Sequence, residues 1–432
     1  MARIKLVYIG GGSTRAPGTV ASIIERGAAF AGSEIALLDL DAEHLAIVQQ
    51  LATAMARDRG HDLTFTTWTD RRAALEGCDA VLSSYRPGGF AARCLDEAIP
   101  LKHGVIGQET QGPGGFFMAL RSIHVMRGII EDMETVCPRA RLFNYTNPIN
   151  IVSEAVTHHS AIPTVSLCEG PLTFPNDVLR PAGLDPKRLD SLLVGLNHGC
   201  WSARHLYDGA DVMPLLAEAY ARLRGDADET PPELQLLELA VTMESIPASY
   251  MRYYYYREQV LAALAAKPTT RAQDILAEVP DYWRHYREQA RSDSPTLDPQ
   301  RSRGGINELE LAIDVIDAVV NDRPSVWPVN VPNRGALTDF PDDLVVEVQG
   351  LCDRHGVTPL AHGHLPPPVR GLMKALGEYQ ALAAEAAWCG TRADAIRALS
   401  ANPLVPTLAK AERIYDELAQ AQRAYLPDRL LR

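Results

Sequence analysis

The chain has 432 residues, of which 46% are hydrophobic and 22% are charged, a composition typical of a globular protein with a large core. Its formal net charge of -12 argues against nucleic acid or an anionic membrane surface as a partner, because both are bound by extended positive surfaces. No apolar run is long enough to span a membrane, and the seven cysteines are scattered without a CxxC pair, so a reduced cytoplasmic protein is expected.

The first predicted unit consists of a strand, a glycine turn and a helix. The strand covers residues 4–9, and a helix over residues 16–26 follows with a proline in its first turn. Between them lie the small residues Gly10, Gly11, Gly12 and Ser13. This order is typical of a dinucleotide site, in which the turn and the helix N-terminus hold a pyrophosphate. The motif alone fits a plain connecting turn equally well, since Arg15 stands where the usual fingerprint has its third glycine.

Strands and helices continue to alternate as far as residue 165. Strands are expected at residues 34–40, 64–67, 80–83 and 141–145, and helices at residues 43–57, 71–76, 117–137 and 151–159. A long loop is expected between residues 84 and 116. A parallel, doubly wound sheet requires this alternation.

Polar residues stand at the ends of these predicted strands. Asp39 lies at the end of the second strand, where its carboxylate could accept a hydrogen bond from a ribose hydroxyl and would favour NAD over NADP. Arg86 and Asn147 follow two later strands. Ligands of open α/β sheets bind beyond the carboxyl ends of the strands, so these three residues and Gly10 are expected to line one crevice.

The second part of the chain begins with strands at residues 164–167 and 192–196, which lead to Cys168 and His198. A thiolate and an imidazole can hold a soft divalent ion, although two such residues alone are more often a buried thiol and a core histidine. Longer helices are expected at residues 231–243, 258–266, 366–387 and 408–425, and the last two are expected to pack on this second part. The predicted organisation is α/β, with a Rossmann-like doubly wound domain over residues 1–165 and a mixed α+β domain over residues 166–432.

Eight segments carry a resemblance that extends, in order, over nearly the whole chain. They are GGGSTRAP at residues 10–17, YRPGG at 85–89, HGVIGQETQGPGGFFMALR at 103–121, NYTNP at 144–148, GLNH at 195–198, PASYMRYYY at 247–255, RGG at 303–305 and NVPNRGALTDFPDDLVVEV at 330–348. In these segments the chain resembles glycoside hydrolase family 4, and most closely its 6-phospho-β-glucosidase branch.

The resemblance implies a fold similar to that of lactate and malate dehydrogenases and a glycosidase that depends on NAD+ and a divalent metal. In the family reaction, NAD+ takes hydride from C3 of the sugar, and the resulting ketone acidifies the proton on C2. A base removes that proton, a metal ion such as Mn2+ stabilises the enediolate, and the aglycone is eliminated. Water then adds and the hydride returns, so NAD+ is not consumed. The family also implies a homo-oligomer, either a dimer or a tetramer.

The resemblance assigns roles to particular residues. Cys168 and His198 match the metal positions, and Tyr250 matches the catalytic base. A phenol with a pKa near its usual value of about 10 needs a nearby cation to act as a base at neutral pH. Asn147 would hold the sugar hydroxyls or the nicotinamide ribose, and Arg86 would contact an anionic group of the substrate or cofactor.

Two positions depart from the family pattern. Glu169 stands where the branches that act on phosphorylated sugars have asparagine, and Glu308 lies where a polar lining follows the RGG motif. Carboxylates near the sugar would repel an anionic substrate, which favours a non-phosphorylated or amino-bearing glycoside. Alternatively, both acids are solvated or paired with Arg86 or Arg303, and the substrate is a 6-phospho-β-glucoside.

Two functions of other classes remain open from the sequence. A net NAD-dependent dehydrogenase would accumulate NADH in step with its product, whereas the glycosidase leaves total NAD+ unchanged. A non-catalytic protein that senses a sugar or NAD would bind both ligands without removing the C2 proton.

Overall fold

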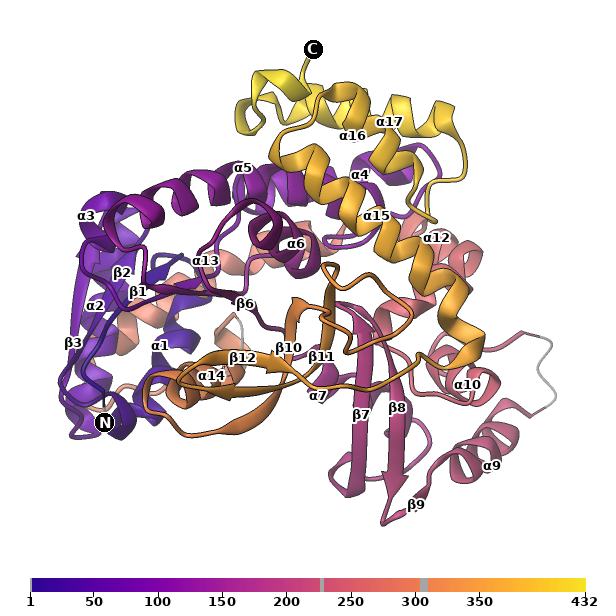
Figure 1. Cartoon of the computed structure of the whole chain (residues 1–432), viewed down its shortest axis with the longest axis horizontal. Helices are drawn as coiled ribbons and strands as arrows, with labels where there is room; N and C mark the ends of the chain where they lie inside the picture. The colour runs from indigo at the N-terminus through magenta and orange to yellow at the C-terminus, as the bar shows by residue number, and fades with distance from the viewer. Residues whose placement is uncertain (1, 226–228, 304–309) are drawn as a thin grey trace.

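The computed structural model describes residues 2–225, 229–303 and 310–432 and contains one mixed sheet (Figure 1). Its strands are β1 (Lys5–Ile9), β2 (Ser33–Leu38), β3 (Leu63–Trp68), β4 (Ala80–Ser83), β5 (Arg141–Asn144), β6 (Thr164–Ser166), β7 (Leu189–Leu196), β8 (Gly199–Tyr207), β9 (Ala210–Asp211), β10 (Ser325–Pro332), β11 (Val345–Asp353) and β12 (Gly356–Pro359). Seventeen α-helices surround the sheet in the described part of the chain.

The helices of the first half are α1 (Ala16–Glu25), α2 (Ala42–Asp58), α3 (Arg71–Leu75), α4 (Gly89–Lys102), α5 (Gly112–Val136) and α6 (Ile149–His159). Those of the middle are α7 (Gly170–Thr173), α8 (Asn176–Leu179), α9 (Met213–Arg224), α10 (Gln235–Met243), α11 (Arg252–Tyr255), α12 (Arg257–Ala265), α13 (Arg271–Ala290) and α14 (Glu310–Val320). The last three are α15 (Arg370–Trp388), α16 (Arg392–Ser400) and α17 (Leu408–Ala421).

The first six strands form a parallel sheet in the order β3-β2-β1-β4-β5-β6, which is the order of a dinucleotide-binding fold. Side chains of β1 alternate between two apolar layers. Leu6 and Tyr8 belong to the core that includes α1 and α2, whereas Val7 and Ile9 belong to the core that includes α5. A sheet buried on both faces explains the continuous apolar run of this strand. The predicted α/β, Rossmann-like fold is confirmed.

Beyond β6 the sheet continues with antiparallel strands. β10 pairs with β6, and β11 pairs with β10, β12 and β7, while β7 forms a hairpin with β8. The predicted boundary after residue 165 therefore lies inside β6, which pairs with strands from both parts. The two-domain division remains a prediction. Every helix in the described residues is too short or too polar to cross a bilayer.

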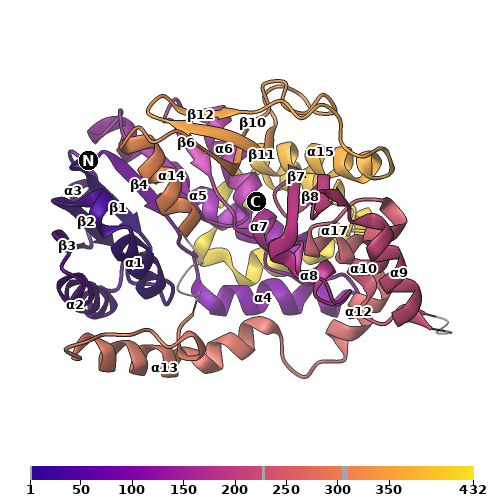
Figure 2. The ribbon, with the colours of Figure 1, turned by 90° about the horizontal axis from the view of Figure 1, so that it is seen from below.

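The C-terminal helices lie only partly where they were expected. α15 packs on α5 and α6 but also contacts β7, and α17 packs on α4, so these helices cover mainly the first half of the chain (Figure 1). Their apolar faces, including Tyr379 and Tyr415, join the same core as Phe116 and Phe117 of α5. α13 contacts both α2 and α4 and lies along the lower edge of the molecule in Figure 2. These helices tie the second part of the chain to the dinucleotide fold.

The expectation of a long loop over residues 84–116 was wrong, because α4 occupies residues 89–102 and α5 already begins at Gly112. The face that α4 buries contains Arg93, Asp96 and Glu97 as well as apolar residues, and Pro100 lies in its last turn. A buried face with three charged side chains has no clear apolar period, so the sequence pattern did not indicate a helix. Two of these charged residues, Arg93 and Glu97, belong to an ion network with Glu109.

Candidate active site

The carboxyl ends of the parallel strands meet as expected, and the glycine turn is fitted closely among them. Gly10 has a φ of +103°, and a Cβ there would lie 2.1 Å from the Ser84 carbonyl oxygen, so only glycine is accommodated. The Gly12 N–H donates to Asp39 Oδ2 over 2.9 Å. The Tyr85 N–H donates to Thr146 Oγ1 at 3.4 Å, which links the ends of β4 and β5.

Two buried oxygens at these strand ends fit a bound cofactor. Ser13 Oγ, in the glycine turn, and Asn147 Oδ1, after β5, are buried and have no hydrogen-bond partner among the described residues. A buried acceptor without a partner is costly, so a ligand donor at each position would remove that cost. Both residues were predicted to contact NAD. The donor set therefore fits a dinucleotide that lies across the ends of β1 and β5.

Cys168 and His198 lie side by side although thirty residues separate them in the sequence. Cys168 follows β6, and His198 forms half of the two-residue turn between β7 and β8, where its φ is +60°. His198 Nε2 lies 3.6 Å from Cys168 Sγ. A histidine in the left-handed region is uncommon, and such positions are concentrated at functional sites.

Burial controls the protonation of both side chains. Burial, together with the nearby Glu347 carboxylate, raises the pKa of the Cys168 thiol to about 12. Burial also lowers the pKa of His198 to about 4, so its imidazole is neutral at physiological pH. A neutral imidazole is ready to bind a metal, whereas the thiol must give up its proton to do so. The pair fits a soft divalent ion such as Mn2+, with substrate oxygens completing the coordination.

The loop before α5 orients the His198 ring. Thr110 Oγ1 lies 2.9 Å from His198 Nδ1, and the same hydroxyl donates to Gln108 Oε1 at 3.1 Å. Since the hydroxyl proton is used on Gln108, the hydroxyl oxygen accepts the Nδ1 proton. Nε2 then presents its lone pair toward Cys168. This arrangement is typical of metal-binding histidines, whose second ring nitrogen is held by a hydrogen bond.

Tyr250 lies against the same imidazole. It belongs to a 3-10 turn over Ser249–Met251, and its ring stacks on His198 with the centroids 3.9 Å apart. The backbone N–H of Ala248 donates to the Cys200 carbonyl, which pins this turn to β8. Burial raises the pKa of the Tyr250 phenol, and the nearby Cys168 and Glu109 groups raise it further. Tyr250 therefore needs a cation close to its oxygen to act as a base.

A buried ion network borders the crevice. Glu109 forms ion pairs with both Arg86 and Arg93, and Arg93 also pairs with Glu97 at 2.7 Å. Arg303 lies over the Phe90 ring at 4.5 Å.

Counted over the described residues, the network carries excess positive charge. Within the described part of the chain the Arg303 guanidinium forms no ion pair. Burial, with the charges of Arg15 and Arg86, lowers the pKa of Arg303 to about 10. Three guanidinium groups, on Arg86, Arg93 and Arg303, thus share two carboxylates, and the excess charge suits an anionic ligand.

Of the two residues that depart from the family pattern, the structure describes only Glu169. Glu169 Oε1 accepts hydrogen bonds from Tyr145 Oη and from the Leu311 N–H, both at 3.3 Å. Its carboxylate is therefore engaged by the protein. Glu308 lies outside the described residues. Arg86, one of the two predicted partners for these acids, pairs with Glu109.

Comparison with known families decides which family the chain belongs to. The chain matches the model of the family 4 glycosyl hydrolases over residues 5–183, and that of their C-terminal domain over residues 193–405. The chain belongs to glycoside hydrolase family 4. Membership confirms the predicted family and, with it, the prediction of a glycosidase that uses NAD+ and a divalent metal.

Relatives of this family 4 glycosidase span its whole length. It is 36% identical to a probable 6-phospho-beta-glucosidase of Bacillus subtilis, over 98% of this chain and 97% of the relative. It is 32% identical to the 6-phospho-beta-glucosidase of Escherichia coli, over 99% and 97% respectively. A crystal structure of the 6-phospho-beta glucosidase from Thermotoga maritima, with NAD and glucose-6-phosphate, aligns with a TM-score of 0.84 at 24% identity, covering 98% of this chain and 99% of that one.

The predicted likeness to lactate dehydrogenase is confirmed at the level of the fold. The Cryptosporidium parvum enzyme aligns with a TM-score of 0.55 at 12% identity, over 89% of this chain and 99% of that one. Sequence reasoning on this glycosidase missed Arg93, because its helix was not predicted, and gave no role to Thr110. A usable signal for Thr110 was its place in the segment of residues 103–121, which carries the family resemblance.

Proposed function

We propose that this family 4 glycosidase hydrolyses a 6-phospho-β-glucoside. The observation that carries the proposal is the cluster of Cys168, His198 and Tyr250 at the carboxyl ends of the parallel strands, next to the two unpartnered oxygens that fit NAD+. In this arrangement Cys168 and His198 would hold the metal and Tyr250 would supply the base near the bound nicotinamide. When bound, NAD+ accepts and returns a hydride, and the metal ion stabilises negative charge on the sugar oxygens.

The side chains of the protein have separate tasks in this proposal. Cys168 and His198 hold the metal, and Thr110 keeps His198 in the tautomer that binds it. Tyr250 removes the C2 proton. Asn147 would orient the sugar or the nicotinamide ribose through its unpartnered oxygen, and the other contacts to NAD+ would come from Gly10, Gly11, Gly12, Ser13 and Asp39. Phe174 lies edge-on to both His198 and Tyr250 and shields the stacked rings from water.

The 6-phosphate is supported by charge. Among the described residues, Arg303 lies near the ion pairs of Arg86 and Arg93, and these three guanidinium groups outnumber the two carboxylates by one, so a sugar phosphate would supply negative charge. Glu169, which raised the possibility of an uncharged substrate, is engaged by Tyr145 and Leu311. The names of the relatives from B. subtilis and E. coli point to the same substrate class.

Paired nitrophenyl β-glucosides, with and without a 6-phosphate, test the proposal in the presence of NAD+, Mn2+ and a thiol reductant. We expect faster release of nitrophenol from the phosphorylated compound and no net change in absorbance from NADH. Preference for the unphosphorylated compound would reject the phosphate, and NADH that accumulates with product would indicate a dehydrogenase.

A pair of arginine variants locates the phosphate contact. Arg303→Gln should raise the KM for the phosphorylated compound by about 10- to 100-fold, because it removes a charge-assisted contact. The matched control is Arg301→Gln, whose side chain pairs with Asp281 and Glu288 outside the network. Equal effects of the two variants would place the phosphate elsewhere.

The proposal includes a cytoplasmic location and a homo-oligomer. All seven cysteines are free thiols in the structure, which suits a reducing compartment. The oligomer is supported by the family resemblance alone. Light scattering on the purified chain tests it, and a monomer at micromolar concentration would reject it.

A further inference from the structure

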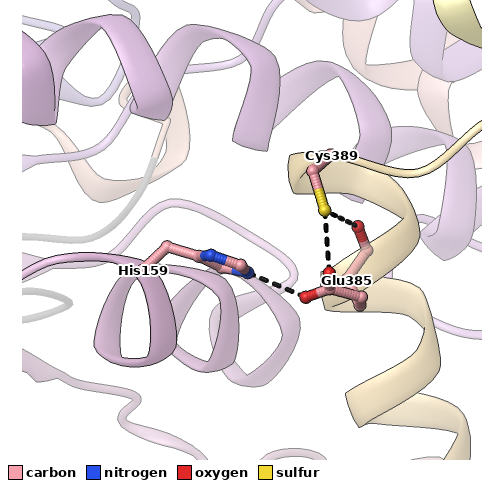
Figure 3. A group of neighbouring side chains, drawn as sticks. All are labelled: His159, Glu385 and Cys389. Atoms are coloured by element: carbon pink, nitrogen blue, oxygen red, sulfur yellow. Dashed lines mark hydrogen bonds and ion pairs between the residues drawn. The ribbon is translucent and has the colours of Figure 1, made fainter.

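Three side chains with metal-binding chemistry meet on the surface where α6 and α15 end (Figure 3). His159 is the last residue of α6, Glu385 lies in the last turn of α15, and Cys389 immediately follows that helix. One imidazole nitrogen, one carboxylate oxygen and the thiol sulfur lie within 4.8 Å of one another. His159 Nε2 is 2.8 Å from Glu385 Oε2, and Cys389 Sγ donates to Glu385 Oε1 at 2.7 Å.

The two helices that carry these side chains are fixed relative to each other. Asn150 Nδ2 on α6 donates to Gln380 Oε1 on α15 at 2.8 Å, and Gln380 Nε2 donates to the buried Glu154 at 2.7 Å. At the surface, the His159 ring stacks on Trp388 with an interplanar angle of 5°. The three donors are therefore held by a buried interface and a stacked ring, so a metal would bind a largely preformed site.

We propose that His159, Glu385 and Cys389 bind a divalent ion of the zinc class, at a site separate from the catalytic pair. Zinc accepts nitrogen, oxygen and sulfur ligands at about 2.0–2.3 Å, so donors this close need only small side-chain rotations to share one ion. A thiolate and a carboxylate balance the charge of a divalent ion. On binding, the metal–sulfur bond replaces the S–H bond of Cys389, and the proton passes to solvent.

The surroundings set the properties of the site. All three ligands are exposed, so water completes the coordination and the ion exchanges readily with solvent. Arg429 donates to the carbonyl oxygens of Trp388 and Ala386 and occupies the C-terminal end of α15. Its positive charge opposes a cation but favours the thiolate of Cys389. Of the described residues, no other group brings together three His, Cys, Asp or Glu donors at such distances.

Binding would connect α15 to the helix that begins beside the active site. α6 starts two residues after Asn147 and ends at His159, so the proposed ion and the predicted sugar contact lie near opposite ends of one helix. The expected role of the ion is to hold α15 on α6. The site should therefore affect stability and leave the chemistry at C2 unchanged.

Zn2+ and Co2+ titrations of the Cys168→Ser variant test the site, because this background lacks the catalytic thiol. We expect one equivalent of Zn2+ by equilibrium dialysis, and a thiolate-to-cobalt charge-transfer band when Co2+ is added. Further change of Cys389 to serine should remove the band and weaken Zn2+ binding more than about 100-fold. Loss of a metal ligand should lower the affinity more than loss of a residue that only hydrogen-bonds to a ligand. His159→Gln should also weaken binding.

Cys94→Ser is the matched control, because Cys94 is a partly exposed thiol outside the cluster. It should leave both the band and the affinity unchanged. Zn2+ stoichiometry can also be measured without the Cys168→Ser change. The wild-type chain should bind two equivalents of Zn2+ and the single variant Cys389→Ser one, and this experiment does not depend on the folding of the double variant. Equal stoichiometry and an equal cobalt band with and without Cys389 would overturn the proposal.

Discussion

His198 is buried and Cys168 is half-buried, whereas His159, Glu385 and Cys389 are exposed, and the comparison shows what burial adds to similar donor atoms. Burial keeps the first pair neutral without a metal, with the thiol pKa raised to about 12 and the imidazole pKa lowered to about 4. A metal that replaces the thiol proton then acts where water cannot screen its charge. The exposed cluster of His159, Glu385 and Cys389 would bind its metal ion in contact with water, which screens the charge of the ion from neighbouring residues.

The buried pair also has neighbours that use the metal. Tyr250 stacks on His198, Thr110 fixes the ring, and Glu109 with its arginines borders the crevice. The exposed group has the ring of Trp388 and the guanidinium of Arg429 beside it, and neither is a base. Whether a metal site can catalyse a reaction therefore depends less on the ligands than on the residues that contact those ligands.

Tyr250→Phe gives the largest expected effect, because it removes the only proton acceptor assigned to C2. Exchange of the C2 proton with deuterated solvent should slow by about 10²- to 10⁴-fold, the usual contribution of a general base. NAD+ affinity should stay nearly unchanged. Tyr253→Phe is the control on the same segment, since the Tyr253 ring lies 6.1 Å from that of Tyr250. Equal slowing in both variants would remove Tyr250 from the base role.

Changing one cysteine in each group tests the comparison directly. Cys168→Ser should weaken Mn2+ binding by at least about 100-fold and lose activity that added Mn2+ restores only in part. Cys389→Ser should retain the turnover of the wild type, because Cys389 is an exposed residue after α15 and has no role in the proposed active site. Calorimetric Mn2+ titration and nitrophenol release measure the two effects. Full activity of Cys168→Ser would show that the thiol is not a catalytic ligand.

The sequence predicted the parts of the molecule in which side-chain pattern and backbone order agree. The β1 strand, its glycine turn and α1 were found because an apolar run, small residues and Pro17 follow one another. Cys168 and His198 were found through the family resemblance, since thirty residues separate them and no local spacing connects them. The structure supplied their 3.6 Å approach.

Other parts could not be predicted because the deciding contacts lie far apart in the sequence. α4 was missed since Asp96 and Arg93 take buried positions that normally carry apolar residues, and their partners, Arg121 and Glu109, lie on later segments. The packing of α15 on α6 depends on pairs such as Asn150 with Gln380, which are 230 residues apart. A hydrophobic period shows that a helix is buried, but it does not show which neighbour covers it.

Lowering the pH should destabilise the fold through a buried carboxylate much more than through an exposed one. Although burial opposes it, the charges of Arg86 and Arg93 lower the pKa of Glu109 from 4.5 to about 2. This depressed pKa stabilises the fold above pH 4.5, and the stabilisation, about 3 kcal/mol, is lost as the pH falls toward 2. In Glu109→Gln, the free energy of unfolding in urea should therefore fall less between pH 4.5 and 2 than in the wild type. This variant should also be less stable at neutral pH, because two arginines lose their partner.

The control for this acid effect is Glu131→Gln, which changes an exposed ion pair with Arg127 on α5. Exposed pairs contribute little, so its unfolding free energy should follow that of the wild type at every pH. If Glu109→Gln instead lost stability between pH 4.5 and 2 as steeply as the wild type, the ion network would not be the source of the effect.

Thr110→Val gives the smallest expected effect. It tests the residue that hydrogen-bonds to His198 without changing a metal ligand. Valine keeps the shape of threonine but leaves His198 Nδ1 without its 2.9 Å partner, so the imidazole can place its proton on Nε2 instead. Mn2+ affinity should fall by about 10- to 100-fold, as for other outer partners of metal-binding histidines. Thr110→Ser keeps the hydroxyl and should restore most of the affinity. If the valine variant bound Mn2+ as tightly as the wild type, the ring would be held by its stacking on Tyr250 rather than by Thr110.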